Sequence, residues 1–118
     1  MDAEQFVDRV RKSVMEGAVD DTLAILLDPP GRRPAPQLVA ISEWYRGLAA
    51  NDREMVGRAL ALASHGAVFG VFAILDGARR IDDEPTPVGF QLWSEGKEGR
   101  KLLSGGLHDL VNSENWYR

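Results

Sequence analysis

The sequence contains no cysteine and only two histidines among its 118 residues. Without cysteine, disulfides, thiolate metal ligands and cysteine nucleophiles are all excluded. The histidines, His65 and His108, are too few for a histidine-rich metal site, although a carboxylate such as Asp76 could complete a mixed one. We therefore expect no bound metal and no cofactor.

Residue spacings that common reactions need are also absent. The chain has none of the patterns GxxxxGK[ST], GxGxxG, GxSxG or HExxH. His108 with Asp109 and Ser104 supplies the residue types of a nucleophilic triad, but triads are assembled from distant positions, so none is expected. His65 lies in an apolar segment and is expected to be a neutral core residue. The sequence favours a protein without enzymatic activity.

No strong excess of charge directs the chain to a particular partner. The net charge is −4, and acidic and basic residues occur in both halves. An acidic surface repels phosphate backbones, so nucleic-acid binding is not expected. The opening residues, MDAEQFVDRV, are charged throughout and lack the apolar core of a signal peptide. These features predict a cytoplasmic protein.

The sequence contains one long apolar segment. No Asp, Glu, Lys or Arg occurs from Ala59 to Leu75. The segment belongs to a predicted helix that begins with a capping box at Asn51 and Glu54 and ends in a left-handed turn at Gly77. The uncharged run reaches the lower edge of the roughly 17 to 25 residues that span a bilayer. Because its flanks lack a basic cluster and an aromatic belt, we expect a buried central helix and no membrane span.

Small residues form a seam along this predicted helix. Glycine inside a helix lowers stability by about 0.5 to 1 kcal/mol relative to alanine. The presence of Gly66 and Gly70 therefore indicates that another backbone approaches this helix closely. The favoured neighbour is another part of the same chain, and the alternative is the same helix of a second subunit in a twofold homodimer. The candidate helix-packing seam consists of Ala59, Ala63, Gly66, Ala67 and Gly70.

The segments before the central helix are predicted to cover it. Apolar residues at spacings of three and four predict helices over residues 3–15, 18–27 and 37–48, with an interruption at Gly17. A proline-rich loop, residues 28–36, separates the second from the third. The third helix is expected to pack antiparallel to the central helix, with Trp44 in the core.

The segments after the central helix predict a β-hairpin. A strand over residues 88–94 is expected to return over residues 100–103 after a turn. Leucine and valine over residues 107–111 suggest a last helical turn, and residues 112–118 are expected to form a tail. The buried face of the first strand would carry Val88, Phe90 and Leu92.

Polar and aromatic residues are expected to converge near the end of the central helix. A pocket between them is the basis of an alternative function, a small-molecule or anion-binding domain. The candidate interaction or pocket residues are Trp44, Tyr45, Arg46, His65, Asp76, Arg79 and Arg80.

Several segments in one order resemble a group of small bacterial proteins. The segments are EWYRGL, NDRE, AVFGVFAILDGARRI and LHDLVNS, and the group has a WY pair, an acidic helix start, and AVFG and LDG motifs near an arginine. The resemblance runs from about Pro29 to Asn112 and rests mostly on packing residues. It implies a helical core and carries no established function, although such small acidic bacterial proteins often act as immunity or accessory partners.

The sequence therefore predicts a mainly helical α+β structure, a small helical bundle around one long central helix with a C-terminal β-hairpin, in a single domain of residues 1–118. For function it favours a non-enzymatic cytoplasmic domain that binds a protein partner or a second copy of itself as a homodimer.

Overall fold

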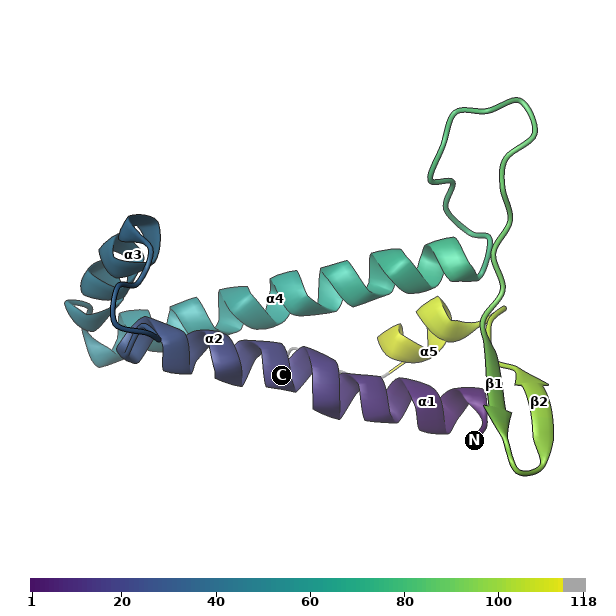
Figure 1. Cartoon of the computed structure of the whole chain (residues 1–118), viewed down its shortest axis with the longest axis horizontal. Coiled ribbons are helices and arrows are strands. Elements are labelled where there is room, and N and C mark those ends of the chain that lie inside the picture. Colours follow the sequence, from purple (N-terminus) through teal and green to yellow (C-terminus); the bar gives the residue numbers. More distant parts are fainter. Residues whose placement is uncertain (114–118) are drawn as a thin grey trace.

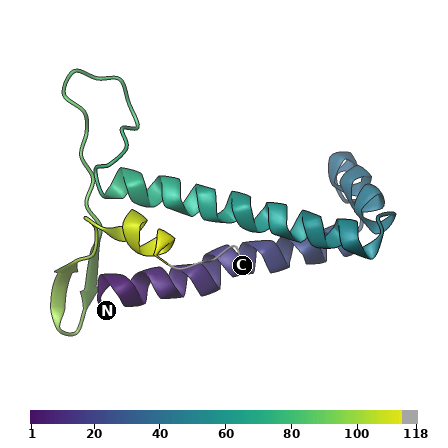
Figure 2. The same cartoon turned by 180° about the vertical axis from the view of Figure 1, so that it is seen from behind.

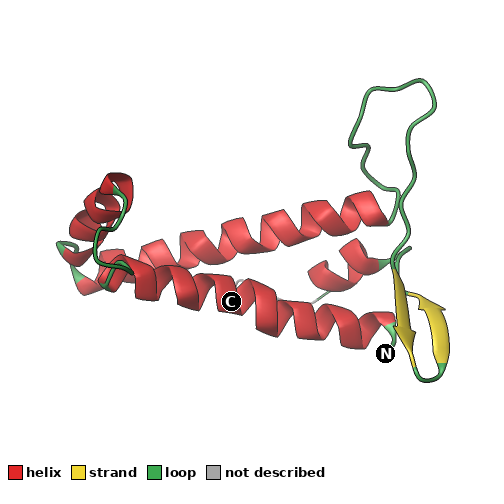
Figure 3. Cartoon of the chain, in the orientation of Figure 1, coloured by secondary structure: helices red, strands yellow, loops and turns green. Residues whose placement is uncertain are grey.

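The computed structural model describes residues 1–113, most of which lie in helices (Figure 3). The elements in chain order are α1 (Ala3–Val10), the π-helix η1 (Arg11–Glu16), α2 (Gly17–Leu27), α3 (Pro36–Arg46), α4 (Ala50–Leu75), β1 (Trp93–Gly96), β2 (Gly99–Leu102) and α5 (Leu107–Asn112). The protein is mainly helical, with one long helix and a two-stranded antiparallel hairpin, which confirms the predicted fold class.

The first three helices form one continuous rod, residues 3–27, which runs antiparallel to α4 (Figure 1, Figure 2). The rod contacts α4 along η1 and α2. The predicted interruption at Gly17 is wrong, because this residue has the helical angles φ −58° and ψ −42°. Where the chain was expected to break, it changes only its hydrogen-bond pattern, from the π-helix back to the α-helix.

The π-helix changes which side chains of the rod face α4. A π turn holds more residues than an α turn and so rotates the positions that follow it around the axis. Met15 is buried as a result, with 6% exposure. Val14 is 51% exposed, although its spacing from Phe6, Val7 and Val10 predicts that it shares their buried side. The hydroxyl of Ser64 in α4 donates a hydrogen bond to the Met15 carbonyl at 3.0 Å. This bond ties the middle of the rod to the middle of α4.

The N-terminal end of α4 does not use the predicted capping box. The N-cap residue is Ala49, which is extended and makes no side-chain hydrogen bond, and Asn51 already lies inside the helix. The carboxylate of Glu54 accepts a hydrogen bond from Arg58 at 3.1 Å. This helix end is exposed, so water can satisfy its first N–H groups and no capping side chain is required.

The C-terminal end of α4 follows the prediction. Gly77 has a positive φ of 77° and turns the chain out of the helix. The N–H of Ala78 donates to the carbonyl of Ala73 at 2.8 Å, which closes the turn. The following residues therefore reverse direction beside the last turns of α4.

The core lies where α1 and the C-terminal half of α4 diverge and α5 fits between them (Figure 1). Leu107 and Val111 of α5 have no exposed surface, and the rings of Phe6 and Phe72 lie 6.0 Å apart. The buried cluster consists of Val7, Met15, Phe72, Leu107 and Val111. A helix of six residues thus supplies the two most buried side chains of the core.

At the other end of the molecule, α3 packs against α2 and does not lie along α4 as predicted. The hydroxyl of Ser42 donates to the carbonyl of Leu26 at 2.6 Å, and Tyr45 is 6% exposed. The prediction of Trp44 as a core residue is wrong, because its side chain is 54% exposed. Adjacent helical residues point about 100° apart, so the face that buries Tyr45 turns Trp44 to solvent.

The hairpin is present, but its first strand begins later than predicted. Trp93 pairs with Leu102, and residues 88–91 form an exposed loop in which Val88 is 62% exposed. A two-stranded hairpin has no second layer to bury an alternating face. Leu92 alone of the predicted face packs against the core.

The hairpin is anchored at its base. The N–H of Leu103 donates to the carbonyl of Leu92 at 2.8 Å, and the N–H of Leu92 donates to the hydroxyl of Ser104 at 3.0 Å. Most of the predicted tail, including Trp116 and Tyr117, lies outside the described residues.

We predict that Leu107→Ala lowers the free energy of unfolding by about 2 to 5 kcal/mol, because it leaves a cavity at a fully buried position. Urea denaturation followed by circular dichroism measures the change. The control is Leu27→Ala at a position that is 49% exposed, where a much smaller change is expected. Equal effects of the two substitutions would contradict the placement of α5 in the core.

Candidate functional site

The main candidate for a functional surface is an uncovered apolar face on α4. Leu62 is 59% exposed, and Met55 and Val71 are each 56% exposed. We define the apolar face of α4 as Met55, Ala59, Leu62, Ala63, Gly66, Ala67 and Val71, all of which are exposed. Such an uncharged, exposed helix surface is a common mark of an interaction site.

Four residues of the predicted small-residue seam lie on this face. Ala59, Ala63, Gly66 and Ala67 are exposed, and nothing lies within 4 Å of the point where a side chain on Gly66 would begin. The favoured prediction, that the chain's own hairpin or another of its helices covers the seam, is wrong for these four positions. The rod packs along α4 through Ser64 and not through these residues, and the hairpin lies beyond the end of α4 (Figure 1).

Gly70, the fifth seam residue, is buried by a side chain. A Cβ atom at this position would lie 2.9 Å from Nη1 of Arg79. Because the chain reverses at Gly77, the side chain of Arg79 extends back over the last turns of α4. The close neighbour at Gly70 is therefore a guanidinium group and not a backbone.

The two groups of predicted pocket residues lie at opposite ends of α4. Trp44, Tyr45 and Arg46 are on α3, next to its N-terminal end, whereas Asp76, Arg79 and Arg80 follow its C-terminal end (Figure 1). A helix of 26 residues is about 39 Å long. The two groups therefore do not line one pocket.

Tyr45 instead has a neighbour on α4. The guanidinium of Arg53 lies 5.3 Å from the centre of the Tyr45 ring and donates a hydrogen bond to the carbonyl of Arg46. A guanidinium over an aromatic face is attracted by the ring quadrupole. These contacts hold the end of α3 to the first turns of α4 and leave Trp44 exposed.

A buried carboxylate joins the ends of α4 and α5. The side chain of Asp76 has no exposed surface and accepts hydrogen bonds from the N–H of Gly105 at 2.6 Å and of His108 at 2.8 Å. Nδ1 of His108 lies 2.5 Å from the same carboxylate. The N-cap residue of α5 is Gly106, which has no side chain, so Asp76 caps this helix from another element.

Opposing effects act on the pKa of Asp76. Burial raises it, but hydrogen bonds from the His108 side chain and from the backbone of His108, Gly105 and Leu107 outweigh burial and hold the pKa below its ordinary value of 3.8. The carboxylate is ionised at neutral pH, so Nδ1 of His108 is the protonated nitrogen that donates to it. The sequence named Asp76 as a carboxylate that could share a metal with a histidine and as a candidate pocket residue, but not as the cap of another helix.

The Asp76–His108 pair serves as a structural joint. An aspartate that orients a histidine is also part of nucleophilic triads. Among residues 1–113, however, no serine or threonine hydroxyl hydrogen-bonds to His108, and Ser104 accepts its hydrogen bond from Leu92. Nor does this part of the chain hold a group of three or more histidines and carboxylates that could bind a metal.

His65, the other histidine, is 7% exposed inside α4. Its ring stacks on Phe69 with centres 6.3 Å apart, and Phe69 meets the His108 ring edge-on at 6.0 Å. These contacts place both histidines beside the core.

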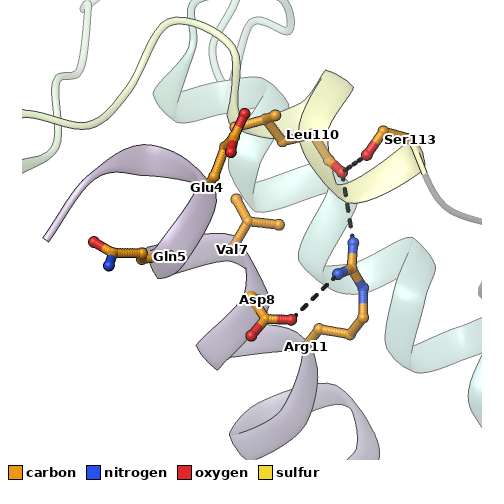
Figure 4. A pocket seen from close by; sticks show the side chains of 7 residues that line it. All are labelled: Glu4, Gln5, Val7, Asp8, Arg11, Leu110 and Ser113. Carbon is orange, nitrogen blue, oxygen red and sulfur yellow. Dashed lines mark hydrogen bonds and ion pairs between the residues drawn. The ribbon is translucent and has the colours of Figure 1, made fainter.

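A hollow of about 460 Å³ lies between α1 and α5 (Figure 4). Arg11 extends across it, with Nη1 3.9 Å from the carboxylate of Asp8 and Nη2 donating to the carbonyl of Leu110 at 3.5 Å. Sequence reasoning did not find this site, although an arginine midway between Val7 and Met15 on one helical face was a usable signal. The contacts of Arg11 hold α1 to α5.

The chain was compared with known proteins by sequence and by structure. No known protein family, no curated protein and no solved structure matches it. The resemblance to small bacterial proteins therefore has no support from these comparisons.

By length and composition, α4 could cross a bilayer, and 22% of its most apolar 18-residue window is buried. The core helix of a soluble protein passes the same test but is mostly buried. The prediction of a buried central helix therefore holds only for the side of α4 that packs against the rod and the core, because its other side has no neighbour within the described chain.

We predict that Asp76→Ala lowers the free energy of unfolding at pH 7 by about 3 kcal/mol, because it leaves two N–H groups and an imidazole N–H without their acceptor. The folded pKa lies below 3.8, so the contribution of the carboxylate is complete above that value and is lost as the pH falls through the folded pKa. The difference between wild type and variant should therefore shrink in strong acid.

Urea unfolding between pH 7 and about pH 2 measures this difference. Asp83→Ala, in the exposed loop, is the control and should change stability by less than about 0.5 kcal/mol. A difference for Asp76→Ala that stays constant down to the lowest pH would contradict an ionised cap.

Proposed function

We propose that this chain is a cytosolic, non-enzymatic protein-interaction domain that self-associates, and that the apolar face of α4 is its binding surface. The observation that carries the proposal is the exposure of Leu62 and Val71 on a helix that has no charged residue from Ala59 to Leu75. Burying one such leucine or valine contributes about 1.5 to 3 kcal/mol. An apolar partner would gain this energy along the whole face.

The size of the exposed surface supports the same conclusion. The chain exposes 8564 Å², whereas a compact monomer of 13.0 kDa is expected to expose about 6,300 Å². The radius of gyration is 17.9 Å, against about 13.5 Å for a compact domain of this length. Part of the excess belongs to the extended loop before the hairpin, but the excess of about 2,200 Å² is well above the roughly 800 Å² that each partner buries in a stable interface.

The small residues favour a helix as the bound element. Ala59, Ala63, Gly66 and Ala67 have little or no side chain, so the backbone of a second helix can come close to α4. Leu62 and Val71 are nine residues apart and so project from opposite edges of this strip, where they would flank the bound helix. A loop or sheet edge would leave its own polar backbone groups facing this apolar strip without partners.

A lipid bilayer is a poorer match than a protein. The Ser64 hydroxyl binds the Met15 carbonyl, so the rod lies directly along α4. The rod exposes charged residues over its length, and inserting α4 would bring these charges into lipid or break the rod away. The exposed charged residues of the rod include Glu4, Arg9, Lys12, Glu16, Asp20 and Asp21.

The chain has a second exposed surface that a protein other than a second copy could bind. The exposed loop after α4 carries Arg79, Arg80, Asp83 and Glu84, and charges of both signs suit recognition of a polar protein surface. A role as an immunity or accessory protein is a hypothesis within this proposal, and a toxin gene beside this one would favour it.

We predict that the wild-type protein at micromolar concentration has a light-scattering mass in size-exclusion chromatography above the 13.0 kDa of one chain. Leu62→Lys should return it to one chain, because a charge would then lie in the apolar interface. The matched control is Leu27→Lys, another exposed leucine outside the face, which should leave the mass unchanged. A strictly monomeric wild type would rule out the self-association.

A further inference from the structure

We infer that the partner on the apolar face of α4 is α4 of a second copy, which runs antiparallel to the first so that Asp52 of each copy lies beside Arg79 of the other. The inference rests on the proposed self-association and adds the identity, direction and alignment of the bound element. It follows from opposite charges at the two ends of the face and from the sizes of the side chains between them.

Each end of the face carries one exposed charge. Asp52 lies in the first turn of α4, one turn before Met55 and on the same side of the helix as Ala59 and Ala63. The guanidinium of Arg79 lies over Gly70, at the far end of the same side. Neither residue forms an ion pair with any residue in the part of the chain that the structure describes. A negative end and a positive end are therefore both available to a partner.

A twofold axis perpendicular to α4 makes these charges complementary. Aligning Asp52 with the partner's Gly70, where the Arg79 guanidinium lies, separates the paired ends by 18 residues along each helix, or about 27 Å. Two Asp52–Arg79 pairs then form at once, one at each end of the interface. A contact between identical surfaces about a twofold axis closes as a dimer.

The same alignment matches large side chains to small ones. Ala59 of one copy then faces Ala63 of the other, so the helices approach most closely near the axis. Met55 lies on the same side of the interface as the partner's Gly66, where nothing of the chain itself lies within 4 Å of the glycine. Met55 of each copy therefore meets the flat part of the partner helix.

A parallel pair would lose both kinds of complementarity. It would place Asp52 beside Asp52 and Arg79 beside Arg79, and Met55 would meet Met55. It would also align the two helix dipoles in the same direction, whereas the antiparallel pair places each positive helix end beside a negative one. Charge and shape thus select the same direction.

The test is a complementary charge reversal. Asp52→Arg places two arginines at each end of the interface, and Arg79→Asp places two aspartates there, so each variant alone should dimerise at least about tenfold more weakly than wild type. An equal mixture of the two variants should recover dimers, because every end then pairs one arginine with one aspartate. The double variant Asp52→Arg/Arg79→Asp should recover the homodimer for the same reason.

Sedimentation velocity over a range of concentrations measures these dissociation constants. Glu54→Arg and Arg80→Asp are the matched controls, since they reverse neighbouring charges without touching the proposed pairs, and both should dimerise like wild type. Thermal unfolding by circular dichroism checks that each variant is folded.

The outcomes separate the inference from the proposal on which it rests. A wild-type monomer overturns both. A wild-type dimer that both single reversals leave intact, or single reversals that are not rescued by mixing, overturns the antiparallel pair while self-association stands. Flotation of the wild-type protein with phosphatidylcholine–phosphatidylglycerol vesicles, lost in Leu62→Lys, would assign the face to lipid and overturn the inference.

Discussion

A helix without charged residues over its last five turns has no side that suits water, and one antiparallel neighbour covers only one side of it. This constraint governs the rest of the structure. The rod of residues 3–27 covers one side of α4, and the Ser64–Met15 hydrogen bond keeps the two helices in register. The opposite side, with Leu62 and Val71, stays exposed in the single chain. This exposed apolar side is the reason that the proposed function rests on packing and not on a catalytic group.

The divergence of the rod from α4 creates a gap that the short helix α5 fills. Six residues cannot form a stable helix by themselves, so α5 depends on its contacts. Leu107 and Val111 bury its apolar side, and the carboxylate of Asp76 satisfies its free N–H groups from the end of α4. The joint thus fixes the direction in which the chain leaves α4. It also determines where Arg79 lies, on the apolar face over Gly70.

Local patterns predicted most of the elements, because helix periodicity and turn residues act over a few neighbouring positions. The end of α4 at Gly77, the stop of α2 before the prolines and the hairpin were all found this way. Two of the errors share one physical cause. Trp44 was expected in the core and residues 88–92 in a strand, but burial depends on what lies opposite a side chain, and no local pattern contains that information. The π-helix was not predicted either, because the residue that hydrogen-bonds to it, Ser64, lies far away in the sequence on α4.

The features of the candidate site also separate into those that local sequence determines and those that tertiary packing determines. The sequence by itself determined that one helix carries a charge-free run and a seam of small residues, because composition and helical spacing are properties of the chain alone. Only the tertiary structure decided that the seam faces outward, that Asp76 pairs with His108 across 32 residues, and that the predicted pocket residues lie at opposite ends of α4. The reason is that one helix has several faces, and the packing of distant segments decides which of them stays exposed.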